Sequence, residues 1–180
     1  EQAAMQYPPG GFVGEKEYEK AISKLKEMEP AYNDLDRGYR SLKEGHAAQA
    51  LALAELGIQK APYEAHLYNL KGKALWMQGD LSGALQSVDR AIQLNPRYFD
   101  FYLQRGLIRL KMGQYGAARM DLLTSQDLLP SAQGEYALGM IALHGGQRAQ
   151  AVTHFKRAAQ NPSATGRAAR EQLRRLQKGR

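Results

Sequence analysis

Four glycines recur at a nearly constant interval along this chain of 180 residues. Gly38, Gly72, Gly106 and Gly139 are spaced 34, 34 and 33 residues apart, and three further markers keep the same register. These are a second glycine, a later alanine and a closing proline: Gly45, Gly79, Gly113 and Gly146; Ala50, Ala84, Ala118 and Ala151; Pro62, Pro96, Pro130 and Pro162. A period near 34 residues is typical of stacked helical hairpins. The pattern predicts a scaffold and favours a role in binding over a role in catalysis.

Each unit divides into a first helix, a turn at the second glycine and a second helix ended by the proline. In the second unit, helices are predicted over 65–78 and 81–94, with Gly79 and Asp80 between them. Pro96 ends the second helix, because proline disfavours a helical residue before it and lacks an N–H group. The predicted fold class is all-α, with hairpins at 31–64, 65–98, 99–131 and 132–163 and a basic capping helix at 164–180.

The residues before the first unit follow another pattern. Residues 1–13 are rich in proline and glycine and have no helical period, so they predict an extended lead-in. Residues 14–29 carry Tyr18, Ile22 and Leu25 at helical spacing and predict a separate helix that ends before Pro30.

The glycines of the first helices predict close packing. A glycine inside a helix costs up to about 1 kcal/mol relative to alanine, so its repetition indicates that the space is needed. We expect the paired helix to approach there, with the repeated alanines opposite. Large apolar residues recur one turn further on and are expected to fill the core: Leu42, Trp76, Leu110 and Leu143.

Composition limits the remaining classes. The chain has no cysteine, which excludes disulfides and thiolate sites, and no apolar run near the roughly 18 residues that span a bilayer. Its start, Glu1-Gln2-Ala3-Ala4, is typical of an excised or processed chain. The net charge of +7 lies entirely in residues 156–180, which have eight basic residues and one acidic residue. Such a tail suits an anionic surface or forms the solvated face of a last helix.

No catalytic set can be identified. The four histidines, His46, His66, His144 and His154, have no zinc-binding spacing, and no nucleophile is paired with a base. The sequence therefore predicts a chain that is not an enzyme and that needs no cofactor or metal.

The repeated residues resemble the tetratricopeptide repeat, whose pattern includes an aromatic, Leu-Gly, Tyr, Ala and Pro. The second unit carries the match at Tyr68, Gly72, Leu75, Ala84, Val88, Ala91 and Pro96. The first unit is the most degraded, with Asp34 and Ser41 at usually apolar places. The family's leucine before the glycine is replaced by Arg37, Lys71 and Arg105 and returns as Leu138. The resemblance implies a right-handed superhelix with a concave binding groove.

The resemblance places groove residues at fixed positions of each first helix. They are Tyr32, Leu35, Tyr39, Lys43, His66, Asn69, Lys73, Met77, Leu103, Leu107, Lys111, Tyr136, Met140 and His144, with Asp100 beside them. This surface is apolar and aromatic, with Lys43, Lys73 and Lys111 along it, and suits a peptide with apolar anchors and a carboxylate. The carboxylate clamp of some family members requires lysine and then asparagine. Here Asn69 precedes Lys73, which argues against that clamp.

A finer resemblance concerns the whole arrangement. The Pro-Pro-Gly-Gly start, the short helix and four repeats are similar to the C-terminal repeat domain of bacterial periplasmic HExxH zinc metallopeptidases that assist outer-membrane assembly. The resemblance implies a protein or peptide partner, including the chain's own protease domain, and a periplasmic location, with the cytoplasm as the alternative. The competing hypotheses are a separate pilotin-like envelope scaffold and a binder of anionic membrane or nucleic acid through the last helix. No nucleic acid is expected in the groove, and homo-oligomers are a further alternative.

Overall fold

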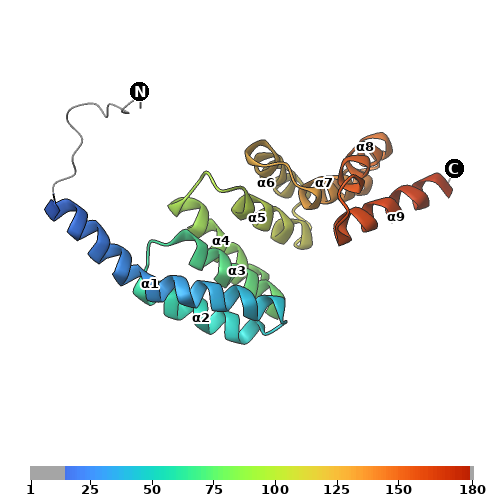
Figure 1. The fold of residues 1–180 in the computed structure, drawn as a ribbon. Helices are drawn as coiled ribbons and strands as arrows, with labels where there is room; N and C mark the ends of the chain where they lie inside the picture. The colour runs from blue at the N-terminus through green and yellow to red at the C-terminus, as the bar shows by residue number, and fades with distance from the viewer. Residues whose placement is uncertain (1–14, 179–180) are drawn as a thin grey trace, which may run out of the picture.

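The computed structural model describes residues 15–178, so the predicted lead-in over 1–13 lies outside the described residues, as do the side chains of Tyr18, Ile22 and Leu25. The described chain consists of nine helices (Figure 1). They are α1 (Glu15–Lys43), α2 (Ala47–Lys60), α3 (Ala65–Gln78), α4 (Leu81–Leu94), α5 (Phe99–Lys111), α6 (Tyr115–Leu128), α7 (Ala132–His144), α8 (Arg148–Ala159) and α9 (Ala164–Lys178). The predicted helices of the second unit agree with α3 and α4 at both ends.

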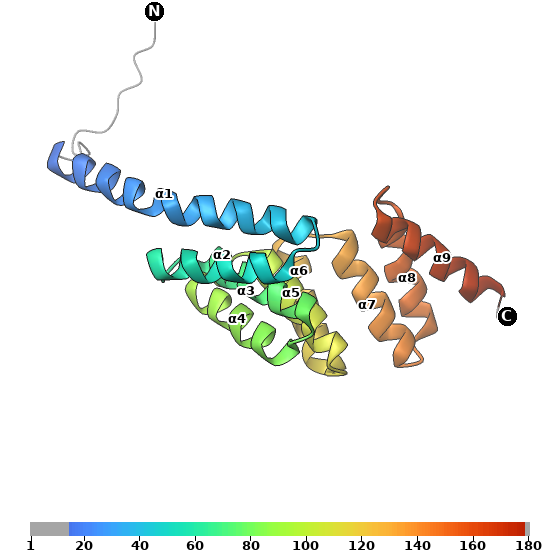
Figure 2. The ribbon, with the colours of Figure 1, turned by 90° about the horizontal axis from the view of Figure 1, so that it is seen from below.

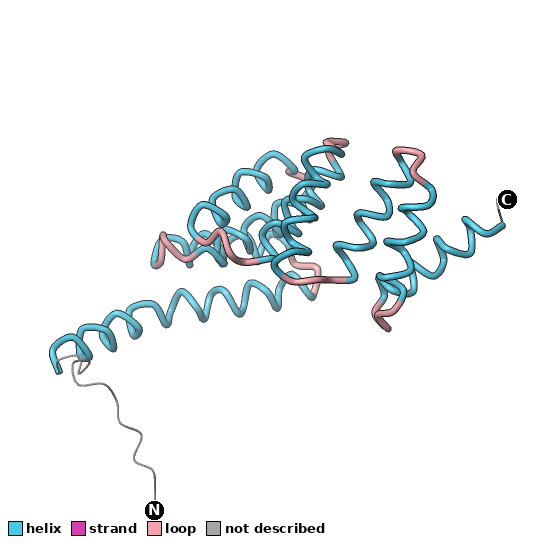
Figure 3. The backbone as a smooth tube through the Cα atoms, turned by 90° about the horizontal axis from the view of Figure 1, so that it is seen from above, coloured by secondary structure: helices cyan, strands magenta, loops and turns pink. Residues whose placement is uncertain are grey.

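Consecutive helices pair as hairpins, α1 with α2, α3 with α4, α5 with α6 and α7 with α8, and α9 packs on α7 and α8. Short loops join them (Figure 3). Gly79 ends α3 with a φ of 88°, a left-handed conformation that glycine adopts without strain. No helix in the described part of the chain is long and apolar enough to cross a membrane. The all-α superhelical prediction is confirmed.

The predicted helix end before Pro30 is wrong. Helix α1 continues through Pro30, and its N-terminal half extends beyond α2 (Figure 2). Proline removes one backbone hydrogen bond, to the carbonyl four residues earlier, but Lys26 and Pro30 are both exposed. Water can therefore solvate the freed carbonyl, and good helix formers on both sides keep the helix continuous.

The mid-helix glycines are packing sites, as predicted. A Cβ atom on Gly72 would lie 2.7 Å from a methyl group of Val88 and 3.2 Å from the carbonyl oxygen of Ala84. A Cβ atom on Gly106 would meet Leu122 at 2.8 Å, and one on Gly139 would meet the Phe155 ring at 2.7 Å. The two helices of each of these hairpins therefore approach too closely for any side chain at the glycine.

The first hairpin fills this space differently. Ala54 occupies the position that Val88, Leu122 and Phe155 occupy in the later units. Because alanine is small, the space above Gly38 is filled by Leu70 from α3, in the second hairpin. Leu67, also from α3, fills the space beside Gly57 on α2. The first hairpin is therefore completed by side chains of the second.

Two of the basic residues that replace the family's leucine, Lys71 and Arg105, form ion pairs with the preceding hairpin, whereas Arg37 lies 3.8 Å from Asp34 of its own helix. Lys71 Nζ lies 2.9 Å from Glu55 of α2, and Arg105 lies 2.7 Å from Asp89 of α4. Arg105 also binds both carboxylate oxygens of Asp121, at 2.9 and 2.6 Å. Burial alone would lower the pKa of Arg105, but the hydrogen bonds to Asp121 and Asp89 raise it above its usual value. At Lys71 and Arg105 the departure from the family pattern thus has a partner one hairpin away.

Candidate functional site

The first helices of the four hairpins share one hollow of about 320 Å³. Helices α1, α3, α5 and α7 contact one another in order, which places them on one inner surface. The lining is largely apolar and includes a residue from each helix: Leu42, Lys73, Trp76, Met77, Gln104, Leu107 and Gln133. The hollow therefore depends on the whole array and not on any one repeat.

A polar cluster lies beside this hollow and joins three hairpins. The buried side-chain amide of Asn69 donates to the Tyr39 hydroxyl at 3.3 Å and to the Asp100 carboxylate at 2.9 Å. Lys73 donates to the same Asp100 oxygen at 2.7 Å and lies 5.7 Å from the centre of the Tyr39 ring. Asp100 thus accepts hydrogen bonds from both Asn69 and Lys73.

This cluster corrects the expected role of two groove residues. The sequence predicts that Lys73 meets a ligand's carboxylate, but Lys73 is neutralised by Asp100 of the same chain. Asn69 is fully buried and engaged by the same group. Both side chains are therefore already engaged by Asp100 of the same chain.

The Tyr39 phenol gives this cluster a measurable signature. Burial raises the pKa of Tyr39 from 10.0 to about 12, and the nearby Asp100 charge raises it as well. Below pH 10 the phenol is neutral in both folded and unfolded states, and between pH 10 and 12 only the unfolded state ionises. We expect the free energy of unfolding to fall by about 2–3 kcal/mol over that window. The Tyr39→Phe variant should lose this part of the slope in urea titrations at stepped pH.

Two of the predicted groove lysines are exposed. Lys43 and Lys111 occupy the same position in the first and third hairpins, and both are exposed. Within residues 15–178, neither has an ion-pair partner. Met77 holds this position in the second hairpin and is 49% exposed at the mouth of the hollow. At this position of successive hairpins, the apolar side chain of Met77 therefore stands between the cations Lys43 and Lys111.

The other predicted groove residues divide into two groups. Leu103 is buried in the core, and Leu35, Tyr136 and Met140 are half-buried against it, so the expectation of a free Leu103 surface is wrong. The rest lie at the surface but have partners. Tyr32 donates to Glu64 at 2.9 Å, His66 packs edge-on against Tyr98 and Phe101, and His144 stacks on Tyr115 at 3.9 Å.

Sequence reasoning misses part of the lining. It places Trp76 and Leu42 only in the core, yet each is half-buried and faces the hollow with its remaining surface. Gln133 stands at the second position of the fourth hairpin, a place already assigned to the groove in the other hairpins. Gln104 has no signal, because the equivalent residues of the other hairpins, Asp36, Leu70 and Ala137, differ in character and none was assigned to the groove.

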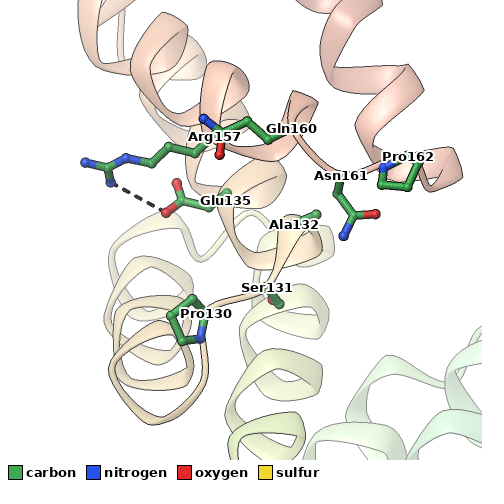
Figure 4. A pocket seen from close by; sticks show the side chains of 8 residues that line it. All are labelled: Pro130, Ser131, Ala132, Glu135, Arg157, Gln160, Asn161 and Pro162. Carbon is green, nitrogen blue, oxygen red and sulfur yellow. Dashed lines mark ion pairs between the residues drawn. The ribbon is translucent and has the colours of Figure 1, made fainter.

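A second hollow, of about 410 Å³, lies between the closing loops of the third and fourth hairpins (Figure 4). Its lining includes the closing prolines Pro130 and Pro162 and the pair Glu135 and Arg157, whose charged atoms lie 3.5 Å apart. His154 also contacts Glu135, at 2.7 Å. The ionic groups of this pocket already pair with one another.

The basic last helix serves partly as a structural cap. Arg170 donates to the Ala159 carbonyl at the end of α8, and Arg148 of α8 donates to the Leu176 carbonyl at the end of α9. Hydrogen bonds from Arg174 and then Arg175 lower the pKa of Glu171 below its usual value. Arg170, Arg174 and Arg175 belong to the basic segment that the sequence alone assigns to an anionic surface or to a solvated helix face. Binding of an anionic surface by the remaining cations stays a prediction.

Four stacked hairpins with an inner groove define a helical-repeat protein. A family model for the TPR repeat matches residues 72–113. Tetratricopeptide repeat protein 36 of Xenopus tropicalis is 31% identical over 53% of this chain and 50% of its own length. A thermophilic TPR protein in Thermus thermophilus superposes with a TM-score of 0.71 at 20% identity, over 89% of this chain and 87% of its own. Together these findings show that the chain is similar to TPR repeat proteins over part of its length and has the same fold as a solved TPR structure.

A further solved structure contains a ligand. The second TPR domain of human RPAP3, in complex with the HSP70 peptide SGPTIEEVD, is similar with a TM-score of 0.59 at 26% identity. That likeness covers 64% of this chain and 97% of the domain. The chain spans half or less of the length of the curated relatives it matches.

Proposed function

We propose that this chain is a protein-interaction module that binds a peptide segment on its inner surface. An apolar side chain of the segment enters the hollow bounded by Trp76, Met77 and Leu107. Acidic residues on either side of it meet Lys43 and Lys111. The observation that carries the proposal is an apolar hollow to which all four hairpins contribute a residue. The peptide complex of a structural neighbour supports this use of the fold.

The two parts of the surface make different contributions. Burying one leucine or phenylalanine side chain contributes about 1.5–3 kcal/mol, and a tryptophan at the centre of an interface is a frequent hot spot. Exposed lysines contribute less to affinity, but they favour acidic partners and speed association. We therefore expect the hollow to set affinity and the two lysines to set selectivity.

Selection of random peptides displayed on phage, with this chain as bait, tests the proposal. The enriched peptides should carry an apolar residue flanked by aspartate or glutamate. A fluorescein-labelled copy of one of them should lose at least about tenfold in affinity for Met77→Glu and for the double variant Lys43→Glu/Lys111→Glu. Lys156→Glu, an exposed charge reversal on α8, is the control and should bind normally. Unchanged binding to both groove variants would show that the site lies elsewhere.

The setting we propose is that of a non-catalytic substrate-handling or regulatory domain of a zinc metallopeptidase of the bacterial envelope. Its support is the resemblance of the lead-in, the short helix and the four repeats to such domains. An HExxH segment upstream in the same reading frame would support this setting. A reading frame without one would favour the stand-alone envelope scaffold and leave the groove proposal intact.

A further inference from the structure

Helix α6 differs from the other second helices on the side that faces away from the array. Its buried residues, Ala118, Asp121, Leu122 and Ser125, all lie on one face. The opposite face carries Met120 and Leu123, which are 67% and 39% exposed. Large apolar side chains in this arrangement form a stripe along the outer surface, far from the inner hollow.

The repeats themselves show that this stripe is specific to the third hairpin. At the position of Met120 the other hairpins carry Ala52, Gln86 and Thr153, and at the position of Leu123 they carry Glu55, Asp89 and Lys156. Two more positions on this side change with them. Arg119 replaces Leu51, Leu85 and Val152, and Asp127 replaces Gln59, Gln93 and Gln160. In the third hairpin, large apolar residues thus stand at the positions of Met120 and Leu123, and a charge of each sign stands at the positions of Arg119 and Asp127.

The spacing of these charges indicates what covers the stripe. Arg119 and Asp127 lie four residues before and four residues after Leu123, and both are exposed. Neither has an ion-pair partner among the residues that the structure describes. Two α6 helices packed antiparallel about a twofold axis at Leu123 would place Arg119 of each beside Asp127 of the other. Gly116, with open space above it, allows close approach at the helix start.

We propose that α6 is a self-association surface, on which a second copy of this chain packs antiparallel and forms a twofold dimer. Met120 and Leu123 make the apolar centre, and two Arg119–Asp127 pairs close its ends. A closed twofold contact uses one self-complementary patch, as this stripe provides. The dimer leaves both inner hollows open and would offer two peptide sites to one partner. The proposal does not depend on what the inner surface binds.

Sedimentation equilibrium across a concentration series tests the pairing. We expect the mass to rise from that of one chain, 20.0 kDa, toward twice that value. Arg119→Asp and Asp127→Arg should each weaken the dimer at least about tenfold, because each places like charges together. The double variant restores opposite charges and should recover most of the affinity. Met120→Gln/Leu123→Glu, which copies residues of the other hairpins, should give a folded monomer.

A crosslink gives an independent measurement, since the chain has no cysteine. Leu123→Cys would place two thiols at the twofold axis, and mild oxidation should yield covalent dimers. Asp89→Cys, at the same position of the second hairpin, is the control and should yield few. A chain that stays monomeric at all concentrations would overturn the proposal. So would a dimer that ignores the charge reversals, because it would use another surface.

Discussion

Phe155→Ala is expected to lower the free energy of unfolding by about 3–5 kcal/mol, the largest effect of any substitution considered. Phe155 is fully buried in the cluster that joins α7, α8 and α9. Its removal leaves a cavity that the surrounding helices can fill only in part. Urea denaturation followed by circular dichroism measures the loss. Tyr63→Ala, which removes an aromatic ring that is 80% exposed, is the control and should change stability by less than about 0.5 kcal/mol.

A substitution at Gly139 tests the same packing contact from the other helix. Alanine at Gly139 places a Cβ atom 2.7 Å from the Phe155 ring, so Gly139→Ala alone should destabilise the chain by about 1–3 kcal/mol. In the Phe155→Ala background the ring is absent and the same substitution should become neutral or stabilising, by up to about 1 kcal/mol. Additive effects of the two changes would contradict the close packing of α7 against α8.

Asp121→Ala should produce the second large effect, a loss of about 2–4 kcal/mol. The Asp121 side chain is 5% exposed and accepts hydrogen bonds from Arg105 and from Arg109, the latter at 2.8 Å. Without the carboxylate, two partly buried guanidinium groups face each other, with only Asp89 nearby to balance them. Thermal and urea unfolding should both report the loss.

Glu171→Ala provides the comparison for Asp121. Glu171 also binds two arginines, Arg174 and Arg175, but those two side chains are 67% and 68% exposed. Its removal should therefore destabilise the chain much less than removal of Asp121, and that smaller effect should shrink further in high salt. Equal losses for the two variants would mean that burial of Asp121 adds nothing to its ion pairs.

The sequence determined the architecture because the repeat markers report directly on packing. In the later hairpins each mid-helix glycine is closely approached by the paired helix, as its spacing implied, but the side chains that meet it are Val88, Leu122 and Phe155 and not the repeated alanines. The prediction at Pro30 fails because a local rule for helix ends ignores whether the freed carbonyl is exposed. The exchange between Gly38 and Leu70 could not be predicted, since it depends on which neighbouring side chain enters a space left by Ala54.

The site was predicted in outline and corrected in detail. Position within the repeat located the inner surface and the lysines that flank it. It could not show that Asp100 neutralises Lys73, because that contact joins different hairpins and depends on side-chain direction. Size alone assigns Trp76 to the core, although a large ring can fill the core with one edge and line a hollow with the other.

The way the first hairpin is completed limits how this array can be rearranged. Later hairpins supply their own packing residue, so each could in principle be exchanged or duplicated as a module. The first cannot, because Leu67 and Leu70 of the second hairpin fill the spaces beside its glycines. A rearrangement that separates these two hairpins would leave cavities in the first hairpin and would expose Leu67 and Leu70 on the second. Evolution and protein engineering alike must therefore treat residues 31–94 as a single inherited block.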